Sequence, residues 1–465
     1  MAPNLVLGIP PSVIQLVQDG LLERAFHDGL FPALQYRAEA DDEEWDAHTG
    51  TSIFMSRPGT LAPVTRPLKP GADPVPQAVA YEQWEAKLDR YSGTIDTHIP
   101  TSVVSNSDQF LRNIHQLGLQ AGQSLNRIPR NSLFKAYLSG QTVTIAAALT
   151  TDTQLRIASC NGFVDVINKG QNVRPSPVST STPLAATVVG VAAPVSIIGC
   201  LPDDPDDPYG PGTLLLAAQL GVGVAARTPV TSSAAPLIIR SGGGSSVDGI
   251  SANDTFTLQD VINAVNKLRR KNVPPHEDGY YHVHINTDGN TQVFQDPAFQ
   301  RLNTALPDGV YYQEAFLGTI AGCMFFMNTE SPDWTNSGTR VSTGANAFYS
   351  SDVGAETTNN SGVNIGRIVV TGRGALYERW LDEKKHYVTE AGLTGKQGDF
   401  QIVNAGIEVE TEHVRLILRA PLNRLQDVVA ASWAITTCFP VPTDSTSGDA
   451  SRYKRAVVIE HAQDS

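Results

Sequence analysis

The 465-residue chain carries 34 Lys and Arg residues against 47 Asp and Glu residues, so its formal net charge is −13. This acidic balance excludes an ordinary basic nucleic-acid-binding protein, because the chain cannot neutralise many phosphates at once. Hydrophobic residues make up 41% of the chain, while 39 Gly and 30 Pro accompany only 17% charged residues. Such a composition predicts a turn-rich, β-rich globular protein of about two to four domains.

The chain has no apolar run of the roughly 18 residues that a membrane span needs, and the longest candidate, 185–201, is broken by Pro194. We therefore expect a soluble protein. The first residues, Met1 to Asn4, lack the basic and apolar regions of a signal peptide, which predicts synthesis and folding in a cytoplasm. Four cysteines lie far apart without a C-x-x-C pair, which indicates buried thiols rather than zinc ligands or a disulfide framework. They are Cys160, Cys200, Cys323 and Cys438.

The first segment, 1–49, contains one predicted amphipathic helix that begins near Pro11 and precedes the acidic run Asp41–Glu44. Its apolar residues recur at helical spacing. They are Val13, Ile14, Val17, Leu21, Leu22 and Phe26.

Residues 50–100 form a predicted long β-hairpin. Two strand-like arms, 51–56 and 79–99, are joined by a stretch rich in Pro and Gly, where six prolines prevent regular structure. An arm of about 50 residues with so little capacity to bury itself is uncommon in a globular domain. We therefore expect another chain to cover it.

The clearest helix is expected in the third segment, 101–140, with Asn106 or Ser107 as N-cap and one apolar stripe over about five turns. Pro129 should end or kink this helix, although 133–137 could continue it. The stripe consists of Phe110, Ile114, Leu117, Ala121, Leu125 and Ile128.

From Gln141 charged residues become sparse and Thr, Ser, Val and Ala alternate, which predicts a separate β domain over 141–240. Its short strands should be connected by turns at 161–162, 175–177 and 203–212. The Gly- and Ser-rich run 241–246 should return the chain flexibly to the main body.

The last segment, 241–465, should be an α+β body. A capping box at Thr257–Asp260 predicts a helix that ends before Pro274-Pro275. A polar loop is expected over 328–364, a turn at 288–289 and a short helix over 296–303. Strands are expected at 280–286, 318–327, 367–371, 401–409, 415–418, 430–439 and 454–460.

One pattern suggests an enzyme: His282 and His284 lie two residues apart on a predicted strand, so their side chains share a face. With Asp288 they could hold a divalent metal. A structural role for the histidines is the preferred interpretation, because no further motif fixes a third ligand. The acidic turn 203–207 could attract calcium but has no EF-hand register, and we interpret it, like 383–386, as solvated surface. The sequence contains no Walker loop, no G-x-S-x-G and no H-E-x-x-H.

Basic residues lie on the predicted hairpin and at the end of the long helix. No aromatic residues interleave with them as a nucleic-acid platform requires, so we favour ion pairs between subunits over phosphate contacts. They are Arg57, Arg66, Lys69, Arg127 and Arg130.

This order of parts resembles the major capsid protein of tailed bacteriophages, the Hong Kong 97-like fold family. Residues 61–71, Leu-Ala-Pro-Val-Thr-Arg-Pro-Leu-Lys-Pro-Gly, look like the tip of the family's extended loop, and 108–136 look like its spine helix. The runs 280–285, 294–299 and 318–323 are similar to the strand–helix–strand of its axial domain. The resemblance covers nearly the whole chain except 141–240, which would be an inserted β-rich domain.

The resemblance implies an N-terminal arm (1–49), an extended loop (50–100), a spine helix in the peripheral domain (101–140), the inserted domain, and the axial domain with the remaining peripheral strands (241–465). It implies a non-enzymatic capsid protein without cofactor, metal or catalytic site. Hexamers and pentamers would assemble into an icosahedral shell around double-stranded DNA, without specific DNA binding or membrane contact.

The expected location is the virion, after synthesis in the host bacterial cytoplasm. A portal is an expected partner, and scaffolding and decoration proteins are possible ones. Some relatives cross-link a lysine to an asparagine, for which Lys69 is a weak candidate. An encapsulin-like compartment shell, a metal-dependent enzyme using His282 and His284, and a surface adhesin remain as alternatives. The adhesin would need a secretion signal that this sequence lacks.

Overall fold

The computed structural model describes two compact units. The first comprises Met1–Ile53, Ala86–Arg130 and Leu376–Pro440, and the second comprises Phe54–Glu85, Asn131–Ala375 and Val441–Ser465. The mixed α+β fold class is confirmed. The structure describes residues 21–463 except 31–34, 47–48, 59–60, 62, 70, 72, 78, 80, 99–108, 168–174, 305–317, 334–337, 341–348, 383–399, 405–412, 420–427 and 444–453.

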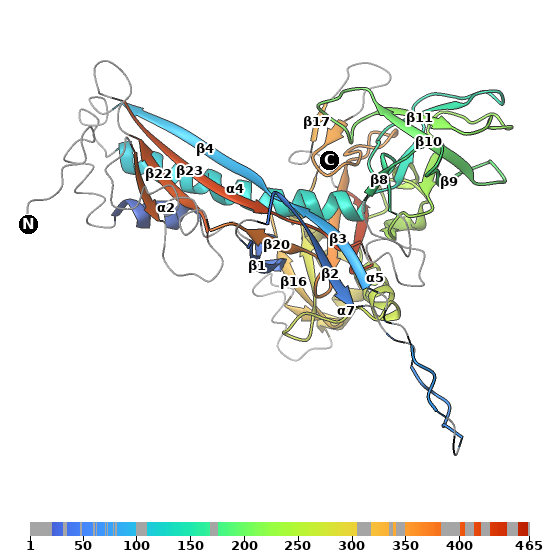
Figure 1. Ribbon diagram of the computed structural model, residues 1–465, viewed down its shortest axis with the longest axis horizontal. Coiled ribbons are helices and arrows are strands. Elements are labelled where there is room, and N and C mark those ends of the chain that lie inside the picture. Colours follow the sequence, from blue (N-terminus) through green and yellow to red (C-terminus); the bar gives the residue numbers. More distant parts are fainter. Residues whose placement is uncertain are drawn as a thin grey trace, which may run out of the picture. The chain divides into compact units, whose positions relative to one another are not determined.

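The first unit is built on a six-stranded sheet. Its longest ladder is the antiparallel pair of β4 (Asp89–His98) and β23 (Val428–Cys438), in register from His98 opposite Val428 to Asp89 opposite Thr437. Figure 1 shows the long helix α4 lying along these two strands. The other strands are β1 (Asp41–Glu44), β20 (Tyr377–Trp380), β22 (Arg415–Arg419) and β21 (Phe400–Asn404).

The acidic run at 41–44 forms β1, a strand that its composition did not predict. It pairs in parallel with β20, from Asp41 opposite Tyr377 to Glu44 opposite Trp380. Beside it, Arg37 donates hydrogen bonds at 2.7–3.0 Å to the carboxylate of Glu378, and both side chains are buried. The buried ion pair between Arg37 and Glu378 therefore helps to hold this acidic strand beside β20.

Helix α4 (Gln109–Tyr137) confirms the predicted long helix and continues through Pro129. Five members of its predicted apolar stripe, from Phe110 to Leu125, are buried, while Ile128 is half-buried. The first five pack against β22, β23 and helix α2 (Leu21–Leu30). The earlier part of the predicted N-terminal helix and the predicted caps Asn106 and Ser107 lie outside the described residues.

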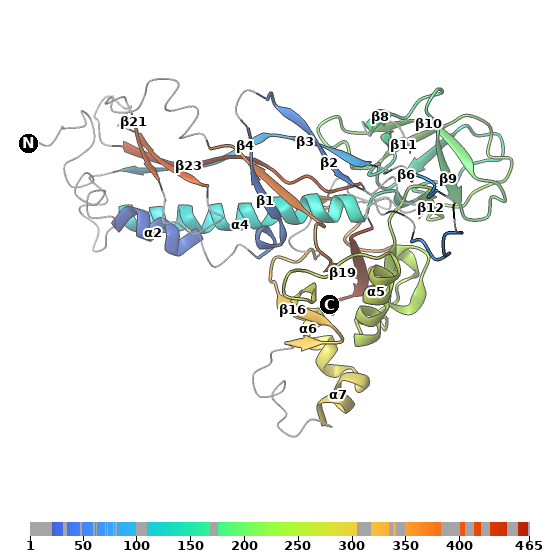
Figure 2. The ribbon, with the colours of Figure 1, turned by 60° about the horizontal axis from the view of Figure 1, so that its bottom comes forward.

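Helices α2 and α4 cross at very close range because each contributes a glycine. A Cβ added to Gly29 would lie 2.5 Å from the carbonyl oxygen of His115, and one added to Gly118 would collide with the carbonyl oxygen of Phe26. Figure 2 shows α2 alongside α4. Because Gly29 and Gly118 have no side chains, the backbones of the two helices can lie this close together.

The second unit contains a six-stranded mixed sheet in the order β13, β24, β19, β14, β16, β15. Every residue of β19 (Ile365–Thr371) and β24 (Ala456–Ala462) is buried, as expected for central strands covered on both faces. The other strands are β13 (Ile238–Arg240), β14 (Tyr281–Ile285), β16 (Cys323–Met327) and β15 (Thr319–Ile320). The strand predicted over 318–327 is thus divided, with a turn at Ala321 and Gly322, which both have positive φ.

Helix α5 (Leu258–Arg270) covers this sheet and begins with the predicted capping box of Thr257 and Asp260. The predicted turn at 288–289 is wrong, because these residues lie in α6 (Thr287–Gln295). The side chain of Asn286 accepts a hydrogen bond from the Gly289 N–H at 2.7 Å and caps that helix. The short helix expected next is confirmed as α7 (Pro297–Thr304).

Residues 141–232 form a third six-stranded sheet, in the order β5, β12, β9, β10, β11, β6. Ile145 N–H donates to Arg156 O at 2.9 Å and Ala158 N–H donates to Val143 O at 3.0 Å, so β5 and β6 also meet and the sheet closes into a barrel. The barrel has its own hydrophobic core. Its strands are β5 (Gln141–Val143), β6 (Gln154–Ile157), β9 (Leu184–Val188), β10 (Val195–Pro202), β11 (Gly212–Leu216) and β12 (Pro229–Ser232).

The predicted turn at 175–177 is wrong, because Pro175–Pro177 forms β8 and pairs with β7 (Asp165–Ile167). Proline is tolerated there because this two-stranded sheet has two edge strands. The predicted linker 241–246 contains a 3-10 turn, η3 (Ser241–Gly243), in which Ser241 is buried and donates to Asp260 at 3.0 Å. Three further short elements are η4 (Val247–Gly249), β17 (Gly338–Arg340) and β18 (Tyr349–Ser351).

Candidate assembly surface

The arm, residues 52–87, is the most exposed part of the described chain. It begins and ends with a two-stranded sheet of β2 (Ser52–Pro58) and β3 (Tyr81–Lys87). Every described residue between 61 and 79 is exposed and outside regular structure. The two strands at its base confirm the predicted hairpin, although the second predicted arm is divided at Leu88 and its later part, β4, belongs to the first unit.

Several large apolar side chains of this arm are exposed to solvent. Val64 is 80% exposed and Val75 is 85% exposed. Apolar side chains gain free energy when they leave water, by about 25 cal/mol per Å² of buried area, and the described chain gives these residues no cover. The large exposed apolar residues of the arm are Leu61, Val64, Leu68, Val75, Val79 and Tyr81.

The base of the arm is anchored, in contrast to its middle. Met55 in β2 and Trp84 and Ala86 in β3 are buried. The guanidinium of Arg57 lies 5.4 Å from the ring centroid of Trp84, within the range of a cation–π interaction. Further along the chain, Thr443 donates a hydrogen bond to the carbonyl of Gln83 at 3.4 Å. The arm is therefore held at its two strands and leaves its middle available to another molecule.

The predicted metal ligands His282 and His284 lie on β14 and Asp288 lies on α6, and the three contact different neighbours. His284 is buried and its ring lies 5.5 Å from that of Phe326, in near-parallel stacking. Asp288 accepts a hydrogen bond from Gln463 at 3.0 Å. Within the part of the chain that the structure describes, His282, His284 and Asp288 do not come together as a set of ligands within 4.8 Å.

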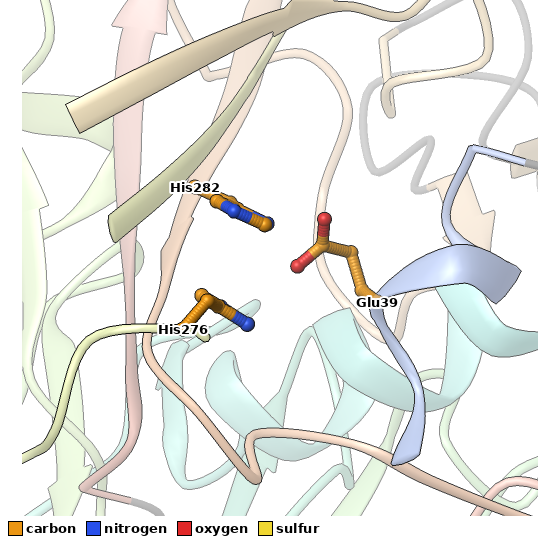
Figure 3. Close-up of side chains that lie close together, drawn as sticks. All are labelled: Glu39, His276 and His282. Atoms are coloured by element: carbon orange, nitrogen blue, oxygen red, sulfur yellow. The ribbon is translucent and has the colours of Figure 1, made fainter. Parts of the chain in front are cut away.

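His282 pairs instead with His276, as Figure 3 shows. The two rings are 3.9 Å apart and nearly parallel, at 8°. The Nε2 atom of His282 lies 2.9 Å from the Oδ2 atom of Asp278. Burial would raise the pKa of Asp278, but a backbone hydrogen bond from Tyr280 and the contact with His282 outweigh it and lower that pKa. This geometry orders the turn before β14.

The acidic turn at 203–207 is partly neutralised within the barrel. Arg156 donates to both carboxylate oxygens of Asp203 at 2.5 and 2.7 Å, and both side chains are more than 40% exposed. Asp204 accepts a hydrogen bond from the Asp206 N–H at 3.0 Å and closes the turn. These contacts agree with a solvated turn. The segment 383–386 lies outside the described residues.

The basic residues proposed for ion pairs between subunits divide into two groups. Arg66 and Lys69 are exposed on the arm, as such a role requires. Arg130 is fully buried within α4, so it is not available to a partner or to phosphate, and that part of the prediction is wrong. The sequence gave no sign of this burial, because Arg130 is a charged residue outside the predicted apolar stripe.

The sequence also gave no sign of an ionic network that joins the barrel to the adjoining body sheet. Arg227 donates to Asp248 at 2.6–2.7 Å and to Glu356 at 2.7–2.9 Å. The carboxylate of Glu460 accepts hydrogen bonds from Arg240 at 2.9 Å and from Arg367 at 3.1 Å. These residues are far apart in the sequence and have no common motif, so only the fold identifies them as partners.

The two carboxylates of this network titrate differently. Burial raises the pKa of Glu356 and outweighs the opposing effect of Arg227. Burial also acts to raise the pKa of Glu460, but the charges and hydrogen bonds of Arg240 and Arg367 outweigh it and the pKa is lowered. A small cavity of about 30 Å³ lies beside them, lined in part by Gln141, Ser159 and Arg240. This volume is enough to hold water.

No helix among the described residues is long and apolar enough to cross a membrane. No family model and no curated protein matches the sequence.

Several solved structures are similar to the chain over most of its length. The capsid structure of the cyanophage P-SCSP1u is 10% identical, with 93% of this chain and 89% of that chain covered and a TM-score of 0.44. The capsid of Ralstonia phage GP4 is 12% identical, with 92% and 87% covered and a TM-score of 0.44. The capsid asymmetric unit of cyanophage Pam1 is 10% identical, with 94% and 92% covered and a TM-score of 0.45.

Proposed function

We propose that this chain is a capsid subunit of a tailed bacteriophage, with the Hong Kong 97-like fold. Copies would assemble as hexamers and pentamers into an icosahedral shell around double-stranded DNA. The observation that carries the proposal is the arm, whose large apolar side chains are 41–85% exposed in the described chain. Such a patch marks a surface that a partner covers, and in a homo-oligomer that partner is another copy.

The arrangement of the other parts supports this function. A 29-residue helix packed along a long antiparallel strand pair provides an extended, rigid element on which neighbouring copies can align. In this proposal α4 is the spine helix, residues 50–100 are the extended loop, and the barrel within 141–240 is an inserted domain. The body from 241 onward supplies the axial domain and the remaining peripheral strands.

Assembly would be mechanical rather than catalytic. Each arm would bury its apolar residues on a neighbouring subunit, and many weak contacts repeated by symmetry would close the shell. The net charge of −13 agrees with a shell that encloses DNA without binding it tightly. A portal and, as separate proteins, scaffolding or decoration proteins would be its partners, and the virion its location.

Deletion of residues 58–78 tests the proposal. We expect a folded, soluble subunit that forms no shells, with the full chain forming uniform shells or rings of subunits under the same conditions. The assay is electron microscopy with analytical ultracentrifugation, alone and with a scaffolding partner. A matched control replaces the same segment with a Gly- and Ser-rich linker of equal length, which preserves chain length but removes the apolar residues. Normal shells from the deletion variant would contradict the proposal.

The particles formed by the full chain also identify the kind of shell. A packaged genome agrees with a capsid, whereas a packaged enzyme would indicate a cellular compartment. Nuclease digestion of the purified particles, followed by analysis of the protected contents, distinguishes the two.

A further inference from the structure

Two of the four cysteines face each other inside the barrel, although 40 positions separate them in the sequence. Cys160 is fully buried in the barrel core, and Cys200 is partly buried and packs against the same core. The register of β10 and β11 places Cys200 opposite Leu214, which is a core residue. Directly opposed residues point to the same side of a sheet, so the Cys200 side chain faces the barrel interior.

Gly212 brings the second sulfur to that position. Gly212 pairs with Pro202, two residues beyond Cys200 on β10, so the inward side of Gly212 is the diagonal neighbour of Cys200. A Cβ at Gly212 would collide with the Sγ atom of Cys160. The Cys160 thiol therefore occupies the space that a side chain at Gly212 would fill. The neighbouring Cys160 thiol and burial raise the pKa of Cys200.

We propose that Cys160 and Cys200 are a redox modification site that forms a disulfide when a peroxide reaches the barrel. The reaction needs a thiolate and is therefore expected at alkaline pH, because the pKa of Cys200 is raised. Cys200, the more exposed thiol, reacts first: its ionised sulfur attacks the peroxide, the O–O bond breaks, and a sulfenic acid and, after protonation of the leaving hydroxide, water form. The sulfur of Cys160 then attacks the sulfenic sulfur. The S–O bond breaks, the S–S bond forms, and the hydroxyl leaves as water with the proton of Cys160. Two thiols are oxidised and one hydrogen peroxide is reduced to two waters.

The disulfide would close a loop of about 40 residues that contains β7, β8 and β9. The barrel would remain reduced in a reducing compartment and become cross-linked in an oxidising one. This inference rests on the two thiols and does not depend on the proposed capsid function.

The test uses the full chain, purified under reducing conditions and then treated with hydrogen peroxide at alkaline pH, where more of each thiol is ionised. We expect loss of the mass of two hydrogen atoms and a Cys160–Cys200 peptide link, both reversed by dithiothreitol. The Cys160→Ser and Cys200→Ser variants should form no such link. The Cys323→Ser and Cys438→Ser variants are matched controls, because each removes a buried thiol from outside the barrel and should leave the link intact.

Oxidation should also slow proteolysis within 161–199 by about tenfold or more, since the closed loop restricts opening of the barrel. Four free thiols after peroxide treatment of the wild-type chain would overturn the proposal, as would links that involve Cys323 or Cys438. If the serine variants fail to fold, as judged by circular dichroism, peptide mapping of the wild-type chain alone decides the matter.

Discussion

Arg227 donates hydrogen bonds to both carboxylate oxygens of Glu356, from Nη1 to Oε1 at 2.7 Å and from Nη2 to Oε2 at 2.9 Å. Arg227 precedes the last barrel strand, β12, whereas Glu356 follows β18. The same guanidinium also donates to Asp248. This single side chain therefore provides an ionic attachment between the barrel and the adjoining part of the second unit.

The Arg227→Ala variant should lose about 3 kcal/mol of unfolding free energy, because Asp248 and Glu356 would remain mostly buried without a counter-charge. Urea denaturation monitored by circular dichroism measures the loss. The matched control is Arg156→Ala, which removes an ion pair with Asp203 in which both side chains are more than 40% exposed. That change should cost less than about 1 kcal/mol. Equal losses from the two variants would contradict the assigned role of Arg227.

His461 should make the protein less stable in acid. Burial lowers the pKa of this fully buried imidazole from 6.5 to about 4. Between these values the unfolded chain binds a proton that the native chain does not, so stability falls as the pH drops from about 6.5 towards 4. This contribution is on the order of 3 kcal/mol. The His461→Gln variant should therefore show a weaker pH dependence of unfolding than the wild-type chain, measured by urea denaturation at about pH 7 and pH 4.5. An unchanged pH dependence would exclude His461 as a source.

The Gly118→Ala substitution should destabilise the first unit by about 2 kcal/mol or more, because a methyl group cannot fit against the backbone of Phe26. Alanine normally stabilises a helix relative to glycine by about 1 kcal/mol, so the expected sign is opposite to that of intrinsic helix propensity. Gln116→Ala, at an exposed position of the same helix, is the control and should change stability by less than about 0.5 kcal/mol. Thermal unfolding followed by circular dichroism compares them. A stabilised Gly118→Ala variant would show that the two helices can separate without cost.

The double substitution Val64→Ser and Val75→Ser should weaken assembly and leave the subunit folded. Both side chains are at least 80% exposed, so their replacement removes little burial from the subunit itself. Light scattering under assembly conditions should show a higher critical concentration, by about tenfold or more for two lost apolar contacts. Asp73→Ser, at another exposed position of the arm, serves as the control. An unchanged critical concentration would indicate that the arm binds through other residues.

The sequence predicts the elements whose own residues determine them. The stripe from Phe110 to Leu125 fixes a helix with one buried face, and the Thr257–Asp260 capping box fixes where α5 begins. The alternating pattern of the barrel strands is equally local, as in β9, where residues alternate between buried and exposed. These signals are repeated over several residues, so tertiary contacts reinforce rather than replace them.

Contacts between distant segments could not be predicted in the same way. The acidic residues of β1 disfavour a strand by composition, yet β20 supplies a parallel partner more than 330 positions later. The Asp288-Gly289 pair is typical of a turn, but the cap from Asn286 includes it in a helix. The wide spacing of Cys160 and Cys200 conceals their proximity, which arises because β11 pairs with both β6 and β10.

Of the candidate site, the arm was predictable because its prolines and bare apolar residues are visible in the sequence. The grouping of His282 and His284 with Asp288 is not found among the described residues, because two-residue spacing gives the histidines a common face but cannot specify their neighbours. His282 lies against His276 and Asp278, whereas His284 lies against Phe326. A ligand set depends on a third side chain whose position only the tertiary structure defines.

The barrel begins with β5 and ends with β12, and these two strands pair with each other, with Val143 opposite Pro229. The chain therefore enters and leaves the barrel at adjacent points, as in domains that tolerate insertion into a host. Gain, loss or exchange of this module in evolution would require the body to change at this junction and at the groups that bind Arg227. The surface features carried by the barrel can thus diversify while the elements that would form the shell stay constant.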